Sequence, residues 1–62
     1  MKYKLKEVRK RKGLTQKQLS EVSHVSKTTI INIETGVRHQ PSIDTLNKLA
    51  GALGCQTKDI FA

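Results

Sequence analysis

The most constraining feature of this 62-residue chain is residues 15–36, which read as two short helices joined by a tight turn. Thr15 is a favourable N-cap residue, and Gln18 follows it by three positions. In this capping box, each side chain bonds a backbone N–H group that the helix leaves unpaired. The pattern predicts a helix that begins after Thr15 and ends near Ser23.

The second of these helices is bounded just as clearly. Ser26 is a suitable N-cap, and Gly36 is the residue type that most readily ends a helix in a left-handed conformation. His24 stands at the turn between the helices, where it can adopt a left-handed conformation more easily than most residues. We therefore predict a helix between Ser26 and Gly36.

Two further helices flank this pair. The first spans about residues 4–12 and ends at Gly13, and the other begins after Ser42 and ends at Gly54. Gly51 should weaken the second of these helices, unless a close packing contact requires glycine there. A last turn, 58–61, follows Thr57 as its cap. Side chains spaced three and four apart predict the core: Leu5, Val8, the stem of Arg9, Leu19, Val22, Ile30, Ile33, Ile43, Leu46, Leu49, Ala50 and Leu53. No alternating strand pattern occurs, so we expect an all-α fold of four to five helices, with residues 1–62 forming a single domain.

The chain is strongly basic. It has twelve Lys and Arg against five Asp and Glu, a formal net charge of +7. Seven of the cations lie within the first twelve residues: Lys2, Lys4, Lys6, Arg9, Lys10, Arg11 and Lys12. Such a cluster is typical of a surface that attracts phosphates, although a charge run can also be a solvated helix face. A membrane-binding helix needs aromatic residues on an apolar face, and the chain has only Tyr3 and Phe61.

Other functional classes find little support. Cys55 is the single cysteine, so no internal disulfide can form, and we interpret it as an ordinary buried or half-buried thiol. No signal peptide or membrane-spanning run is recognisable, and we expect a soluble cytoplasmic protein. No catalytic, nucleotide-binding or metal-ligating pattern is present, so we expect no enzymatic activity, no cofactor, no metal and no small-molecule effector.

The helix between Ser26 and Gly36 has an unusual outer face. With about 100° of rotation per residue, Ile30 and Ile33 share the core side. The opposite side carries Lys27, Thr28, Thr29, Ile31 and Asn32. Asn pairs bidentately with adenine, Lys donates to guanine, and Thr bonds a base or contacts a thymine methyl. This face therefore predicts base contacts in a DNA major groove, with Ile31 against a thymine methyl or another subunit.

Helix N-termini offer a second kind of contact. Their unpaired N–H groups and partial positive charge suit phosphate oxygens. Gln16 and Lys17 lie in the first turn after Thr15, and Ser26 caps the next helix. We expect Gln16, Lys17 and Ser26 to contact DNA phosphates while the next helix reads bases.

The stretches LKEVRKRKGLTQKQLSEVS, VSKTTIINIETG, PSIDTLNKLAGALG and DIF resemble the helix-turn-helix family of Cro and the lambdoid phage repressors, also called the XRE family. The similarity runs from about Leu5 to Phe61. It implies a lambda-repressor-like DNA-binding domain whose second and third helices form the helix-turn-helix. It also implies phosphate binding by Gln16, base reading by Lys27, Thr28 and Asn32, an ion pair between Arg9 and Glu34, and backbone contacts from Arg38, His39 and Gln40.

Three positions depart from the family pattern. His24 stands where Gly is usual in the turn. Ser20 replaces a common Ala, and its hydroxyl requires an acceptor, for which a carbonyl one turn back is a candidate. Val37 replaces a frequent basic residue, which shifts the expected phosphate contact towards Arg38.

We expect a sequence-specific regulator that binds double-stranded DNA as a homodimer and represses transcription, in a bacterium, phage or plasmid. Ile60 and Phe61 are candidates for the dimer surface, unless Phe61 folds back on the core. A protein-interaction module, such as an antitoxin or adaptor with the same fold, is the main alternative, supported by Ile31 and the tail. RNA binding through the basic first helix is a second alternative, but sequence-specific RNA readers use stacking aromatics.

Overall fold

The structure, a computed structural model, describes residues 3–36 and 41–60. Within these two ranges the chain forms four α-helices and one 3₁₀ turn, with no β-strand. The helices are α1 (Leu5–Arg11), α2 (Gln16–Ser23), α3 (Lys27–Thr35) and α4 (Ile43–Leu53), and the 3₁₀ turn is η1 (Thr57–Asp59). The predicted all-α fold is confirmed.

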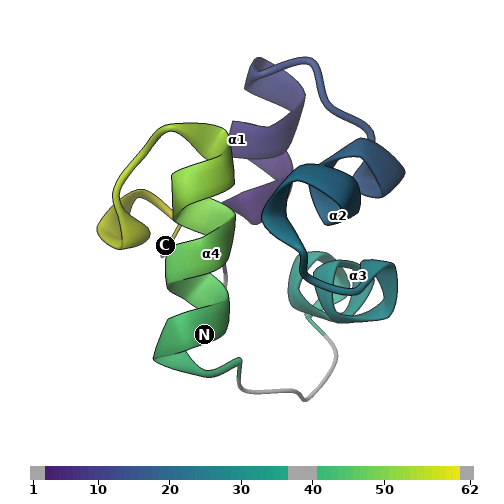
Figure 1. Cartoon of the computed structure of the whole chain (residues 1–62). Helices are drawn as coiled ribbons and strands as arrows, with labels where there is room; N and C mark the ends of the chain where they lie inside the picture. The colour runs from purple at the N-terminus through teal and green to yellow at the C-terminus, as the bar shows by residue number, and fades with distance from the viewer. Residues whose placement is uncertain (1–2, 37–40, 61–62) are drawn as a thin grey trace.

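The helices pack in an order that leaves α3 at one side of the molecule (Figure 1). α2 packs against both α3 and α4, α1 contacts α3, and η1 lies against α4. In Figure 1, α4 stands upright, with α2 and α3 stacked to one side of it. The backbone N–H of Lys4 donates to the carbonyl of Ile60, which joins the start of α1 to the end of η1.

The ends of α2 are fixed by local hydrogen bonds, as predicted. Thr15 Oγ1 accepts from the backbone N–H of Gln18 at 3.0 Å, and Gln18 Oε1 accepts from that of Thr15 at 2.9 Å. These two contacts form the capping box. At the other end, His24 has φ of 60°, the left-handed conformation. α2 therefore begins and ends where the sequence predicts.

Side-chain caps also open the next two helices. Ser26 Oγ accepts from the N–H of Thr29 at 3.2 Å at the start of α3, and Ser42 Oγ accepts from Thr45 at 3.1 Å at the start of α4. α3 ends at Gly36, where φ is 74°, a conformation that glycine adopts without steric penalty. These boundaries are confirmed as well.

One cluster of buried apolar side chains lies between the helices: Leu5, Val8, Leu19, Val25, Ile30, Ile33, Leu46, Leu49, Ala50, Leu53 and Ile60. The stem of Arg9 is buried beside it. Two core predictions are wrong, since Val22 is 55% exposed and Ile43 is 66% exposed. In α2 the buried partner of Leu19 is Ser23, four residues on, so Val22 is turned outward. Ile43 is the first residue of α4 and lies past the edge of the core.

The C-terminal turn differs from the prediction at two points, its N-cap and the burial of Ile60. Gln56, rather than Thr57, is the N-cap of η1, and the Thr57 hydroxyl donates to Asn47 Oδ1 on α4 at 2.6 Å instead. Ile60 is fully buried, so it cannot contribute an exposed apolar group to a dimer surface. Phe61 lies outside the described residues. Ile60 is part of the core because η1, which directly precedes it, packs against α4.

Gly51 has no packing reason of the kind considered from the sequence. A Cβ built at this position would meet no atom within 4 Å, so no close contact requires glycine there. Gly54 is different, because its φ of 68° lies in the left-handed region at the end of α4.

Candidate nucleic-acid interface

The helix-turn-helix consists of α2, the turn at His24 and α3. Serine hydroxyls hold the turn together. Ser23 Oγ donates to the Leu19 carbonyl at 2.6 Å and accepts from the N–H of Val25 at 3.2 Å. Ser20 Oγ donates to the Val25 carbonyl at 2.7 Å. Both polar groups of the Val25 backbone are therefore bonded to side chains of α2, which fixes the direction in which the chain enters α3.

The acceptor predicted for Ser20 was wrong in direction. Its hydroxyl bonds forward to Val25 rather than back to a carbonyl one turn earlier. The physical reason is that α2 ends at the left-handed His24 and the next residue, Val25, is buried, where a backbone carbonyl needs a hydrogen-bond partner. Serine in place of alanine thus adds a hydrogen bond to the turn.

The predicted reading face lies on the side of α3 away from the core. Ile30 and Ile33 are buried, whereas Lys27 and Thr28 are exposed. The remaining three residues of this face, Thr29, Ile31 and Asn32, are partly exposed. The side chains of Lys27, Thr28 and Asn32 form no hydrogen bond or ion pair with any other described residue. Their polar groups are consequently available to a ligand.

Two residues of the predicted interface, Ser26 and Thr29, bond to each other at the N-terminus of α3. The Ser26 hydroxyl donates to Thr29 Oγ1 at 2.8 Å while its oxygen accepts from the Thr29 N–H. The Ser26 hydroxyl hydrogen is thus used within the protein. Thr29 Oγ1 accepts that bond and keeps its own hydrogen for a further acceptor.

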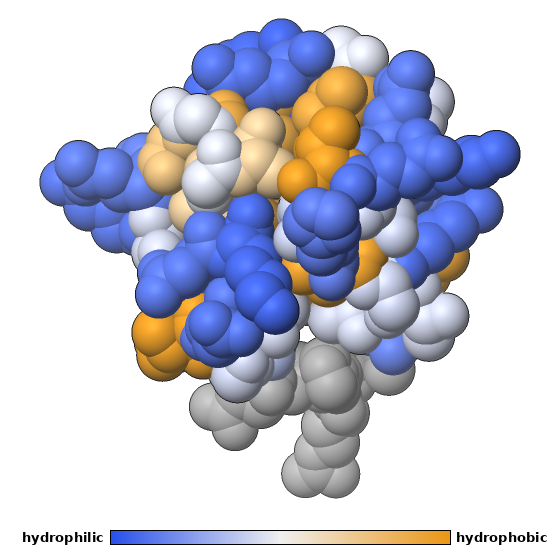
Figure 2. Space-filling view, in the orientation of Figure 1, coloured by the Kyte–Doolittle hydropathy of each residue, from blue (hydrophilic) through white to orange (hydrophobic). Residues whose placement is uncertain are grey.

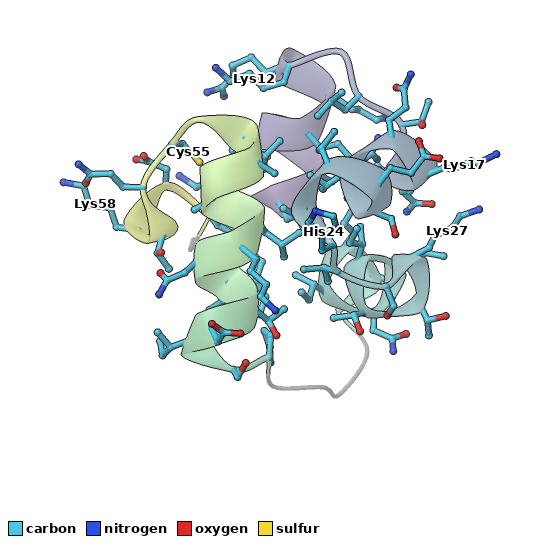
Figure 3. The ribbon with its side chains drawn as sticks, viewed as in Figure 1. Lys12, Lys17, His24, Lys27, Cys55 and Lys58 are labelled. Carbon is cyan, nitrogen blue, oxygen red and sulfur yellow. The ribbon has the colours of Figure 1, made fainter. Side chains whose placement is uncertain are left out.

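Two lysines give this side of the molecule its positive charge. Lys17, on α2, and Lys27, at the start of α3, are both exposed. Figure 3 shows their side chains extending from the same side of the molecule, and Figure 2 shows a hydrophilic surface there. The first turns of α2 and α3 therefore present ammonium groups together with unpaired backbone N–H groups, a combination that suits anions.

A buried ion pair connects α1 to the end of α3. Arg9 Nε donates to Glu34 Oε2 at 2.7 Å, and Arg9 Nη2 donates to Glu34 Oε1 at 3.1 Å. Only 9% of the Arg9 side chain and 2% of the Glu34 side chain are exposed. Arg9 Nη1 also donates to the Leu14 carbonyl at 2.8 Å. Arg9 is thus a structural residue rather than a free cation for phosphate.

Glu34 has a second partner, which the sequence did not indicate. Gln16 Nε2 donates to Glu34 Oε1 at 3.0 Å, so the carboxylate at the end of α3 also holds the first residue of α2. No sequence signal gives this contact, because the two residues are eighteen positions apart and their spacing matches no local motif. The Gln16 amide has one further N–H hydrogen and its oxygen available for other contacts.

The remaining predictions concern the residues after Gly36, metal binding and membrane spanning. Arg38, His39 and Gln40 lie outside the described residues. Over residues 3–36 and 41–60, no group of His, Cys, Asp and Glu side chains has an arrangement that could hold a metal ion. In the same ranges no helix is long and apolar enough to span a bilayer.

Comparison with known proteins agrees with this geometry. A helix-turn-helix family model matches residues 5–60. The immunity repressor protein of Bacillus phage phi105 is 42% identical over 57 residues, which are 92% of this chain and 39% of the phage protein. The competence pilus inhibition repressor of Acinetobacter baylyi is 46% identical over 55 residues, 87% of this chain and 48% of that repressor. This chain therefore spans less than half the length of these two relatives.

A solved structure shows the same arrangement of helices. The restriction-modification controller protein C.AhdI from Aeromonas hydrophila superposes with a TM-score of 0.85 and 31% sequence identity, covering 94% of this chain and 86% of that protein. The match includes both helices of the motif, since it extends over nearly the whole chain. Sequence and structure together place the chain in the XRE-type helix-turn-helix family of DNA-binding transcriptional regulators.

Proposed function

We propose that the chain is a sequence-specific DNA-binding domain of residues 1–62 that inserts α3 into the major groove as a homodimer and represses transcription. One observation carries the proposal. Lys27, Thr28 and Asn32 project from one face of α3, and their side chains have no partner among the described residues. Unpartnered Lys, Thr and Asn groups on an exposed helix are the donors and acceptors that base edges require.

The contacts divide into two kinds. Lys27, Thr28, Thr29, Ile31 and Asn32 face bases, while Lys17 and the amide of Gln16 bind phosphates beside the groove. The second N–H of Gln16 donates to a phosphate oxygen while Glu34 holds the first. Ser26 acts through the backbone N–H groups at the N-terminus of α3, because its hydroxyl is committed to Thr29. Arg38 and His39, which follow Gly36 in the sequence, add further phosphate contacts.

Dimerisation and repression rest on different support. Regulators with this motif bind paired half-sites about one helical turn apart, which requires two copies. Ile43 is 66% exposed at the start of α4 and offers an apolar group that a second copy would cover. The relatives from phage phi105 and Acinetobacter baylyi are named as repressors, and occlusion of a promoter requires only DNA binding.

Selection of binding sites from a random duplex library at near-physiological salt tests the proposal. The expected product is a palindromic motif with half-sites about ten base pairs apart. The double variant Lys27→Ala, Asn32→Ala should recover no motif, whereas Lys48→Ala, which removes an exposed lysine from α4, should recover the parent motif. Binding without any motif, and lost as salt rises, would mean that net charge alone drives association.

A further inference from the structure

A second charged surface lies away from the helix-turn-helix. A groove of about 490 Å³ runs between α1 and the segment that contains η1. Its lining consists of Lys4, Glu7, Val8, Arg11, Lys12, Cys55, Lys58 and Asp59. In Figure 3, Lys12 and Lys58 extend on one side of the molecule, and Lys17 and Lys27 extend on the other. The groove therefore lies on a different side of the molecule from Lys17 and Lys27.

The cations of the groove are not neutralised by ion pairs. Lys4, Arg11, Lys12 and Lys58 are all exposed. The ion pairs within residues 3–36 and 41–60 are Arg9–Glu34 and Lys48–Asp44, and neither includes a residue of the groove. Four cations face two carboxylates, those of Glu7 and Asp59, so the groove has an excess of two positive charges.

The floor of the groove is uncharged. Val8 is buried, and Cys55 is a half-buried free thiol. Burial, and then the nearby Asp59 carboxylate, raise the pKa of the Cys55 thiol, while Lys12 opposes them. The thiol is thus protonated near neutral pH and acts as a small apolar group. The groove therefore combines a small uncharged patch, at Val8 and Cys55, with a cationic rim.

We propose that this groove binds an acidic peptide segment of a partner protein, whose carboxylates pair with the cationic rim while an apolar side chain rests on Val8 and Cys55. Charge complementarity favours a peptide. Glu7 and Asp59 would repel the closely spaced phosphates of a nucleic acid, but a peptide can leave a gap between its own carboxylates at these points. Asp59 Oδ2 already accepts from the Gln56 N–H at 3.0 Å, which holds that carboxylate in place. The site goes beyond the proposed function, because DNA binding by α3 does not use it.

Amide NMR titration of the ¹⁵N-labelled chain tests this site with two end-blocked peptides, Glu-Glu-Leu-Glu-Glu and Gln-Gln-Leu-Gln-Gln. The acidic peptide should shift the amides of Val8, Arg11, Cys55 and Lys58 in a saturable manner, and the neutral peptide should not. The double variant Lys12→Glu, Lys58→Glu should weaken the acidic peptide by about tenfold or more, as expected for the loss of two charge pairs. If that variant unfolds, Lys12→Gln, Lys58→Gln removes the two positive charges without introducing negative ones.

The matched control removes two lysines from the opposite side. Lys17→Gln, Lys27→Gln should weaken DNA binding and leave affinity for the acidic peptide unchanged, whereas Lys12→Gln, Lys58→Gln, which removes the same amount of charge, should do the reverse. Shifts confined to α2 and α3 would overturn the proposal, because the peptide would then only imitate DNA on the reading face. Equal responses to the two peptides, no saturable shift, or groove amides that respond to a DNA duplex instead would also overturn it.

Discussion

The carboxylate of Glu34, at the end of α3, accepts a hydrogen bond from the side-chain amide of Gln16, at the start of α2, at 3.0 Å. The same oxygen accepts from Arg9 Nη2 at 3.1 Å. One buried carboxylate therefore joins α1, the first turn of α2 and α3. This arrangement couples a proposed phosphate ligand, Gln16, to the helix that we propose reads the bases.

Removal of Glu34 should leave a buried guanidinium without its counter-charge. Glu34→Ala is expected to lower the free energy of unfolding by about 3 kcal/mol, since only 9% of the Arg9 side chain is exposed. The double variant Arg9→Met, Glu34→Met should lose less than Glu34→Ala alone, because an apolar pair leaves no unpaired charge. Urea denaturation measures both values. Equal unfolding energies for Glu34→Ala and the parent would show that the pair does not stabilise the fold.

Gln16 should affect stability and DNA binding in separable ways. Gln16→Ala removes one hydrogen bond to Glu34, which should lower the free energy of unfolding by about 1 kcal/mol. The proposed phosphate contact is lost as well, so affinity for DNA should fall by a similar factor for every sequence. Gln16→Glu should be less stable than Gln16→Ala, because it brings a second carboxylate to Glu34. Fluorescence anisotropy with specific and random duplexes would reveal a sequence-dependent loss, which would contradict a phosphate role.

Substitution of Asn32 should change the base preference, whereas substitution of Lys17 should change the overall affinity for DNA and its salt dependence. Asn32→Ala should relax the preference at one base pair of each half-site by about 1–3 kcal/mol. Lys17→Ala should weaken all sequences alike and reduce the slope of log affinity against log salt by about one. Competition binding with singly substituted sites distinguishes the two. An unchanged preference in Asn32→Ala would remove Asn32 from the reading face.

The two glycines near the end of α4 should respond in opposite directions to alanine. Gly51→Ala should raise the free energy of unfolding by about 0.5–1 kcal/mol, because the position has open space and alanine favours the helix. Gly54→Ala should lower it by about 1 kcal/mol, because a φ of 68° is unfavourable for a residue with a Cβ atom. Thermal unfolding followed by circular dichroism measures both, and loss of stability in Gly51→Ala would indicate a packing role that the structure does not show.

Local chemistry explains which structural features could be predicted from the sequence. The capping box of Thr15 and Gln18, and the cap at Ser26, involve residues three positions apart, so their contacts follow from helix geometry. Periodicity identified the buried side of each helix but not how far the core extends along it. For this reason the periodicity places Val22 and Ile43 in the core, although both are exposed.

The contacts between helices could not be predicted from the sequence pattern alone. The link between Gln16 and Glu34 depends on how α2 and α3 pack, and the forward bond of Ser20 depends on the path of the chain after His24. The Arg9–Glu34 pair was expected only from the family resemblance. The composition of the outer face of α3 could be predicted, because an amphipathic helix buries Ile30 and Ile33 and turns Asn32 away from the core.

Methylation interference on a selected binding site tests most directly whether α3 reads the major groove. Dimethyl sulfate methylates guanine at N7, in the major groove, and adenine at N3, in the minor groove. We predict that guanine N7 methylation within both half-sites blocks binding, that adenine N3 methylation there is tolerated, and that the Lys27→Ala variant loses part of the guanine interference. Interference only from adenine N3 would place the protein in the minor groove and contradict the proposed role of α3.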